Sequence, residues 1–276
     1  MFSLHYLCPI MKITLIGAGK LGAQLGRKLH SSGEQLLQVF SRKAEKAEAL
    51  ARKTRAKACT RPEEIEAGAD LYILATADDA IAPMAQKLRQ QLPPDSLLVH
   101  TSGSQPSDLL IASTGPIPPE DQRYGVFYPL QSFTPDSEPD WEQIPFCIYA
   151  RQKTDEDLLT ELARRLSPRV YRINDRQRKE LHLAAVFANN FTNYLLAQAF
   201  KHCQQYDIPF ELLHPLILET ARKATSGQHP KELQTGPAVR GDEETINRHL
   251  QQLQNQPELQ KLYQLLTRLI RQQNQS

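Results

Sequence analysis

The sequence lacks paired cysteines and long apolar runs, and each absence removes a class of protein. Its four cysteines are Cys8, Cys59, Cys147 and Cys203. Their wide separation argues against a zinc site and a disulfide framework, and it favours reduced thiols in a cytoplasm. No apolar stretch approaches the roughly 20 residues needed to span a bilayer. We therefore expect a cytoplasmic protein with no metal site and no membrane partner.

An excess of charge of one sign is also missing. The 276 residues carry 33 Lys and Arg against 31 Asp and Glu, a net charge of +2, so we expect no nucleic-acid partner. The first ten residues lack the basic segment and small-residue cleavage site of a signal peptide. Because an apolar strand pattern begins just after Met11, we expect residues 1–10 to be an extension ahead of the folded domain.

Apolar runs typical of β-strands alternate with helical stretches through the first two thirds of the chain. The strand-like runs cover residues 12–19, 36–42, 69–76, 96–104, 124–133, 145–150 and 169–174. The helical stretches between them cover residues 21–33, 43–54 and 78–92. Continuous apolar strands between amphipathic helices predict a parallel sheet covered on both faces. The Pro-rich residues 114–122 and 134–145 are interpreted as loops of this domain.

The pattern changes near Asp175, after which no convincing strand occurs. Helical periodicity covers residues 176–206, 209–225, 242–254 and 257–273. The sequence therefore predicts an α/β protein with two domains. Residues 1–174 would form a domain built on the sheet, and residues 175–276 an all-helical domain.

A glycine-rich turn joins the first predicted strand to the first predicted helix. Gly17, Gly19 and Gly22 form the pattern G-x-G-x-x-G in the strand–turn–helix context that a dinucleotide site requires. There the first glycine permits the turn, the second lets the backbone approach a pyrophosphate, and the third allows close packing. The predicted cofactor-binding turn consists of Gly17, Ala18, Gly19, Lys20, Leu21 and Gly22. The alternative is a glycine-rich turn without a ligand.

The end of the second predicted strand distinguishes between two dinucleotides. NAD sites place an Asp or Glu there, which hydrogen-bonds the ribose 2′-hydroxyl. This chain has Ser41 and Arg42 at that position, with Lys43 next. A hydroxyl and a guanidinium suit a 2′-phosphate, which a carboxylate would repel. NADP is therefore predicted as the cofactor, against the alternative of an ordinary solvated basic turn.

Two further strand ends carry polar residues toward the edge where open α/β sheets bind ligands. Ala75, Thr76 and Asp78 follow one strand, and Thr101 and Ser102 follow another. All five are candidate cofactor-binding residues. Two alternatives are left open. Asp78 and its neighbour would stabilise a helix N-terminus, and Ser102 would shape a turn.

The long helix after Asp175 carries the candidate catalytic groups. His182 and Asn189 fall on one stripe at α-helical spacing, with Val186 between them and Asn193 beyond. Polar groups on an otherwise apolar helix are costly to bury without partners. We predict that this face completes a cleft between the domains, with His182 and Asn189 binding or protonating a developing oxyanion. The alternatives are that His182 only makes a structural hydrogen bond, and that Asn190 replaces Asn189.

Five motifs occur in a characteristic order: "ATADDAI", "HTSG", "FYPLQSF", "LHLAAVFANNF" and "LQTGPAVRGD". Together they resemble Rossmann-like proteins whose helical half is catalogued as domain of unknown function 2520. More distantly, the layout resembles the 6-phosphogluconate dehydrogenase, ketopantoate reductase and pyrroline-5-carboxylate reductase group. The resemblance implies a Rossmann-type NADP-binding domain over residues 1–174, a helical domain over residues 175–276 that binds substrate and often dimerises, and an active site between them.

Two positions depart from those families. The β-hydroxyacid dehydrogenases carry a lysine where this chain has His182, so a lysine proton donor is not supported. Tyr128 replaces a histidine common in relatives, and its hydroxyl could still donate a hydrogen bond. By analogy with a loop of the related reductases, Arg240 is a candidate for binding a substrate carboxylate, with simple solvation as the alternative. Asp242 is interpreted as a helix N-cap.

These observations predict an NADPH-dependent oxidoreductase that acts as a homodimer on a small-molecule carbonyl or imine. By resemblance, a 2-oxo acid such as ketopantoate is one such substrate. The alternatives are a non-catalytic NADP-binding sensor and a reductase of NADP that uses coenzyme F420.

Overall fold

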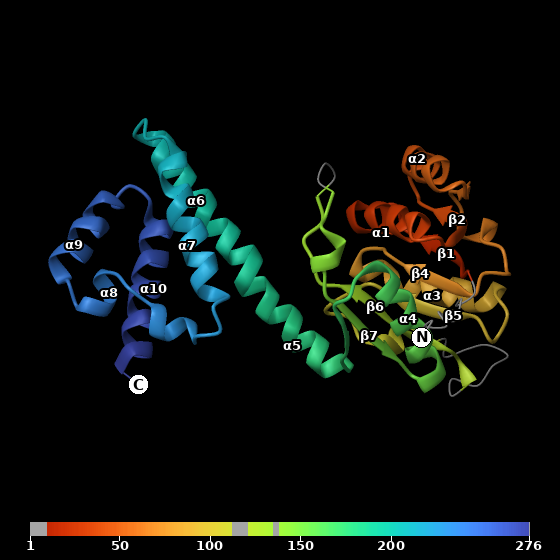
Figure 1. Cartoon of the computed structure of the whole chain (residues 1–276). Helices are drawn as coiled ribbons and strands as arrows, with labels where there is room; N and C mark the ends of the chain where they lie inside the picture. Colours follow the sequence, from red (N-terminus) through yellow and green to blue (C-terminus); the bar gives the residue numbers. More distant parts are fainter. Residues whose placement is uncertain (1–9, 112–120, 135–137, 276) are drawn as a thin grey trace, which may run out of the picture. The chain divides into compact units, whose positions relative to one another are not determined.

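The computed structural model describes residues 10–111, 121–134 and 138–275 (Figure 1). The chain divides into two compact units, residues 1–192 and residues 193–276, and each is described by itself. The change from strands to helices falls between β8, which ends at Arg172, and α5, which begins at Asp175. Residues 1–9 of the proposed extension and parts of both Pro-rich loops lie outside the described residues. The functional domain boundary at residue 174 stays a prediction.

The first unit contains one eight-stranded sheet. Its strands are β1 (Lys12–Ile16), β2 (Gln35–Phe40), β3 (Lys57–Cys59), β4 (Leu71–Leu74), β5 (Leu97–His100), β6 (Tyr124–Pro129), β7 (Phe146–Ala150) and β8 (Val170–Arg172). Their spatial order is β3-β2-β1-β4-β5-β6-β7-β8. Strands β4, β5 and β6 are buried along their whole length, as expected of strands covered on both faces.

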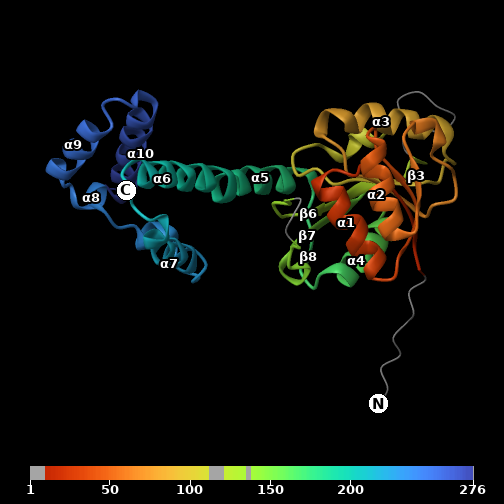
Figure 2. The same cartoon turned by 90° about the horizontal axis from the view of Figure 1, so that it is seen from above.

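Helices cover both faces of this sheet. They are α1 (Lys20–Ser31), α2 (Ala44–Thr54), α3 (Asp78–Gln91) and α4 (Lys153–Leu166). Residues of α1, α2 and α4 pack into one apolar cluster with β1, and residues of α3 pack into a second cluster with β4. Figure 2 shows α3 and α4 on opposite sides of the strands. The predicted two-faced α/β fold is confirmed.

Two elements and one strand direction differ from the prediction. The three-residue strand β3 and helix α4 were not predicted, although α4 buries Leu159, Leu162 and Leu166 at helical spacing. The prediction of a parallel sheet is wrong at one pair, because β6 and β7 are antiparallel. Parallel neighbours need a crossover, usually a helix. The described part of the connection from β6 to β7 contains only the short 3₁₀ turn Trp141–Gln143.

The predicted all-helical second part is also confirmed. After α5 (Asp175–Ala185) comes a π-helical turn, Val186–Phe191, and then α6 (Thr192–Gln205). The remaining helices are α7 (His214–Ala224), α8 (Pro237–Arg240), α9 (Glu243–Gln252) and α10 (Pro257–Gln275). In the described ranges, no helix combines the length and apolar character needed to cross a membrane.

Candidate functional site

The glycine-rich turn adopts a backbone conformation that other residues would not tolerate. Gly17 has φ of +117°, and a Cβ there would lie 2.2 Å from the carbonyl oxygen of Ala75. A Cβ on Gly22 would lie 2.0 Å from the carbonyl oxygen of Gly17. The space beside Gly19 is open, with no atom within 4 Å of a built Cβ. The turn therefore brings strand and helix into close contact and leaves Gly19 facing free space.

Helix α1 begins directly after this turn. Gly19 is its N-cap, and its first turn contains no acidic residue. The first N–H groups of a helix have no partner within the helix, and the helix dipole places positive charge at the same end. An anion is therefore favoured at Gly19. The partly buried side chain of Leu21 packs against the apolar core.

A cleft of about 940 Å³ opens at the carboxyl ends of β1, β2 and β4. Its lining includes Gly17, Ala18, Gly19, Ser41, Arg42, Lys43, Lys46, Ala75, Thr76, Asp79 and Lys87. The structure thus brings together three predicted segments: the glycine turn, the end of β2 and the end of β4. The buried hydroxyl oxygen of Thr76 has no hydrogen-bond partner among the described residues. Buried polar atoms are seldom left unpaired, so this oxygen suits a ligand.

The charge of the cleft is strongly asymmetric. Arg42, Lys43, Lys46 and Lys87 face one lining carboxylate, that of Asp79. The hydroxyl oxygen of Ser41 accepts a hydrogen bond from the backbone N–H of Lys43 at 3.2 Å, which shapes the loop after β2. Four cations against one carboxylate favour a ligand with several negative charges.

The other predicted strand-end residues lie outside this cleft lining. Thr101 is buried, and its backbone N–H and hydroxyl both donate to the carbonyl of Leu74. The hydroxyl oxygen of Ser102 accepts from the N–H groups of Ser104 and Gln105. Ser102 therefore shapes the turn, as its alternative interpretation expected. Both residues support the strand ends.

Asp78 lies in the first turn of α3 and is tied to the loop after β5. Its carboxylate accepts from the hydroxyl of Ser104 at 2.6 Å and from the amide of Gln105 at 3.5 Å. Burial alone would raise the pKa of Asp78. The hydrogen bonds from this loop and the nearby His182 lower it overall. Asp78 therefore remains an anion that holds the loop against α3.

Tyr128 and His182 meet beside this loop. The tyrosine Oη lies 3.3 Å from Nδ1 of His182. Burial raises the pKa of Tyr128 to about 12, so its hydroxyl keeps its proton at neutral pH and can donate. Two strand spacings separate β6 from β4, about 10 Å along the sheet edge. The pair is thus placed beside the cleft.

Gly103 makes this meeting possible and was not predicted as a site residue. A Cβ on Gly103 would lie 2.5 Å from Nδ1 of His182 and 2.8 Å from Oη of Tyr128. Any larger residue would push the pair apart. The sequence signal was the motif "HTSG", interpreted only as a turn.

A buried ion pair fixes the start of α5 and was also missed. Arg178, whose side chain is 1% exposed, donates to Asp175 at 2.7 Å and also to the carbonyl of Gln105. The second oxygen of Asp175 accepts from the N–H and hydroxyl of Ser107. Because Arg178 precedes His182 by about one helical turn, this anchor fixes the position of the imidazole. The signal was a basic residue four positions before His182.

His100, the last residue of β5, supports the loop that follows this strand. Its ring is fully buried, Nδ1 accepts from the N–H of Ser102, and Nε2 faces the carbonyl of Pro106 at 3.3 Å. Burial, with the nearby Arg178 charge, lowers the pKa of His100 to about 4. The ring is therefore neutral in the folded protein near pH 7.

This burial predicts a specific loss of stability in mild acid. An unfolded histidine binds a proton near pH 6.5, whereas folded His100 does so only near pH 4. As the pH falls from 7 to 5, the unfolded chain gains a proton that the folded one refuses, so unfolding becomes easier by about 2 kcal/mol. We expect urea unfolding to show this loss and His100→Gln to reduce it. An equal loss in His100→Gln would contradict the assignment.

The remaining predicted residues lie on the π-helical turn and in the second unit. Asn189 and Asn190 are exposed in the π-helical turn. The stripe prediction assumed continuous α-helical spacing, and the extra residue of a π turn rotates the residues after it by about 100°. Arg240 is exposed at the end of α8, in the second unit. Asp242 is the N-cap of α9 and accepts from the N–H of Thr245, so the capping interpretation is confirmed.

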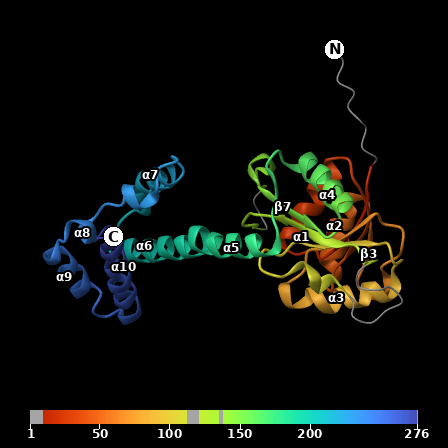
Figure 3. The ribbon, with the colours of Figure 1, turned by 90° about the horizontal axis from the view of Figure 1, so that it is seen from below.

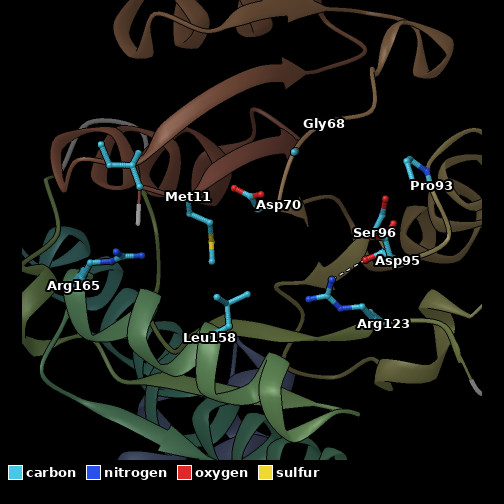
Figure 4. A pocket seen from close by; sticks show the side chains of 11 residues that line it. Met11, Gly68, Asp70, Pro93, Asp95, Ser96, Arg123, Leu158 and Arg165 are labelled. Atoms are coloured by element: carbon cyan, nitrogen blue, oxygen red, sulfur yellow. Dashed lines mark hydrogen bonds between the residues drawn. The ribbon is translucent and has the colours of Figure 1, made fainter. Parts of the chain in front are cut away.

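A second cavity, of about 570 Å³, lies at the opposite edge of the sheet (Figure 4). Met11 and Asp70 line it where strands begin, and both of its arginines are paired within the protein. Arg123 pairs with buried Asp155 at 2.5 Å and donates to the carbonyl of Asp95. Arg165 pairs with buried Glu34 at 2.9 Å. Ligands of open α/β sheets bind at the carboxyl ends of strands, so the first cleft is the candidate site.

A parallel sheet with a strand–glycine turn–helix at its carboxyl edge defines the Rossmann class of dinucleotide-binding domains. Comparisons agree with this class. Residues 12–103 match the family described as NADP oxidoreductase, coenzyme F420-dependent, and residues 144–270 match domain of unknown function 2520. No curated protein matches the chain.

A crystal structure from Bacteroides fragilis, of a protein provisionally named an NADP oxidoreductase, is 42% identical. The match covers 95% of this chain and 98% of that chain, with a TM-score of 0.86. This chain therefore belongs to the same Rossmann-like oxidoreductase family, and the predicted resemblance is confirmed.

Two more distant structures show the fold alone. A protein from Thermotoga maritima is 21% identical, with 95% of this chain and 98% of that chain covered and a TM-score of 0.68. A 1-pyrroline-5-carboxylate reductase from Streptococcus pyogenes is 15% identical, with 95% and 99% covered and a TM-score of 0.63. The two-part arrangement of strands followed by helices is thus shared across the whole chain.

Proposed function

We propose that this protein is an NADPH-dependent oxidoreductase that reduces a small carbonyl or imine compound. One observation carries the proposal: the open face of Gly19 leads into a cleft whose β2 end presents Ser41 and Arg42 and no carboxylate. A pyrophosphate suits the first position and a 2′-phosphate suits the second.

Bound NADPH would supply the hydride for such a reduction. The residues of this chain would then bind and protonate the substrate atom that gains negative charge. Tyr128 is suited to donate, because its high pKa keeps the proton on Oη. His182 lies within hydrogen-bonding distance of that oxygen and is suited to replace the proton. Asn189 and Arg240 stay proposed substrate-binding residues.

The cofactor proposal predicts a change of preference on substitution of Arg42. Arg42→Ala should weaken NADPH binding about tenfold to a hundredfold and leave NADH binding nearly unchanged, because only NADPH carries the 2′-phosphate. Fluorescence titration of both nucleotides measures this directly. Arg52→Ala is the matched control, since Arg52 is exposed on α2 and does not line the cleft. Tighter binding of NADH by the wild-type protein would contradict the proposal.

The substrate class can be tested separately from the cofactor. We propose 2-oxo acids, ketopantoate among them, and cyclic imines as substrates. The imines are included because pyrroline-5-carboxylate reductases share the fold. NADPH oxidation with each compound measures turnover. NADPH binding without turnover of any of them would favour the sensor alternative, and the F420 alternative is tested by adding that coenzyme.

We also propose that the protein is a cytoplasmic homodimer. The second unit exposes large apolar side chains, with Leu212 68%, Leu216 62% and Leu218 70% exposed. Such a concentration of exposed apolar area is typical of an interface. Light scattering after size exclusion measures the mass, and a monomer at micromolar concentration would contradict the dimer.

A further inference from the structure

A second, smaller groove lies between α1 and α2, on the same unit as the cleft. It encloses about 220 Å³. Four cationic side chains line it, Lys20, Arg27, Lys46 and Lys53, and we call it the basic groove. Small and apolar residues of the two helices, among them Ala23, Ala49 and Leu50, complete the lining. Figure 3 shows both helices within the first unit.

The four cations form two pairs along the groove. Lys20 and Arg27 are seven residues apart on α1, and Lys46 and Lys53 are seven residues apart on α2. Seven residues are about two helical turns, or about 10 Å. Both helices follow parallel strands and run away from the carboxyl edge of the sheet. Lys20 and Lys46 therefore lie at the end of the groove near the carboxyl edge, the upper end. Arg27 and Lys53 lie at the opposite, lower end.

The cations of the groove are not neutralised by the protein. The groove lining contains no carboxylate. Across the ranges that the structure describes, none of the four side chains takes part in an ion pair. The acidic residues of α2, Glu45 and Glu48, are exposed and do not line it. Four like charges on a shared groove repel one another, and a bound anion relieves that repulsion.

The basic groove is distinct from the dinucleotide cleft. The two share Ala18, Gly19 and Lys46 at the carboxyl edge. Arg27 and Lys53 line the groove alone, about two turns further down their helices. The Ser41–Arg42 loop lines the cleft alone. A dinucleotide held by the glycine turn and this loop therefore leaves the lower pair free.

We propose that the basic groove binds a second ligand, a short linear anion of about 10 Å that carries two or more phosphate groups. The two pairs of cations each hold one end, and the small side chains between them admit the chain of the ligand. Arg27 provides the planar, bidentate donor that phosphate prefers, and the lysines provide point charges. The site does not depend on the identity of the dinucleotide, so its test does not depend on redox activity.

Inorganic tripolyphosphate is the probe, and calorimetry on the full chain is the measurement. We expect binding that weakens with added salt, as for an ionic ligand. The double variant Arg27→Gln, Lys53→Gln should lose at least tenfold in affinity. Arg52→Gln, which removes an exposed cation from the same helix outside the groove, should not. Orthophosphate should bind much more weakly, because it cannot reach both pairs.

Three results would overturn the proposal. The first is no detectable binding of tripolyphosphate to the wild-type protein, and the second is the same affinity in the double variant as in the wild type. The third is a loss of affinity in Arg42→Ala as large as the loss in the double variant, which would place the ion in the dinucleotide cleft. A thermal melt of each variant checks that it is folded. Should the double variant unfold, Arg27→Lys with Lys53→Gln keeps one cation, and an intermediate affinity is expected. Stronger binding of a tetraglutamate peptide than of tripolyphosphate would assign the groove to a carboxylate ligand and so contradict the phosphate class.

Discussion

Gly19→Ala is expected to weaken NADPH binding at least tenfold while leaving the protein as stable as before. A Cβ on Gly19 meets no protein atom within 4 Å, and the backbone there, with φ of −74°, suits any residue. The added methyl group would instead occupy the space through which a pyrophosphate approaches the first N–H groups of α1. Fluorescence titration gives the affinity, and urea unfolding gives the stability.

Gly17→Ala provides the contrast. Its Cβ would lie 2.2 Å from the carbonyl oxygen of Ala75, at a φ of +117°, so we expect a loss of about 3 kcal/mol or more in unfolding free energy. Loss of binding in this variant would therefore be a consequence of strain. Unchanged NADPH affinity in folded Gly19→Ala would show that the glycine turn is not the dinucleotide site.

Removing either member of the Tyr128–His182 pair is expected to lower turnover about a hundredfold, the usual contribution of a positioned acid–base group. Tyr128→Phe deletes only the hydroxyl and keeps the ring, which packs with Val126 and Cys147. His182→Ala removes the partner imidazole. Steady-state oxidation of NADPH with an accepted substrate measures both variants, and kcat is expected to fall more than KM rises.

The control for this prediction is cofactor affinity. Neither residue lines the 940 Å³ cleft, so NADPH should bind both variants as it binds the wild-type protein. Gly103→Ala is a further check, because its Cβ would lie within 3 Å of both partners and should reduce turnover without removing either group. Full activity in Tyr128→Phe and His182→Ala would exclude the pair from proton transfer.

The sequence was informative where function depends on local backbone geometry. The turn at Gly17 and Gly22 could be predicted, because only glycine fits a positive φ or a carbonyl 2 Å away. The position of Ser41 and Arg42 could also be predicted, because the end of a buried strand is readable from its apolar run. Both segments line the cleft as expected.

The contacts between distant segments could not be predicted in the same way. Tyr128 and His182 are 54 residues apart, and their meeting depends on strand order, on Gly103 and on the anchor at Arg178. The π turn at Val186–Phe191 has no simple sequence signature, and the predicted stripe through His182, Asn189 and Asn193 assumed α-helical spacing across it.

The reversal between β6 and β7 determines the direction from which α5 reaches the ligand edge of the sheet. In a sheet with every strand parallel, the chain would leave β8 at the crowded ligand edge and turn away from it. Here β8 runs parallel to the reversed β7 and therefore away from that edge, so the next segment must climb back along the last strands toward the end of β6. Two successive turns of α5 therefore reach the same region, because Arg178 contacts the loop after β5 and His182 contacts Tyr128 near the end of β6.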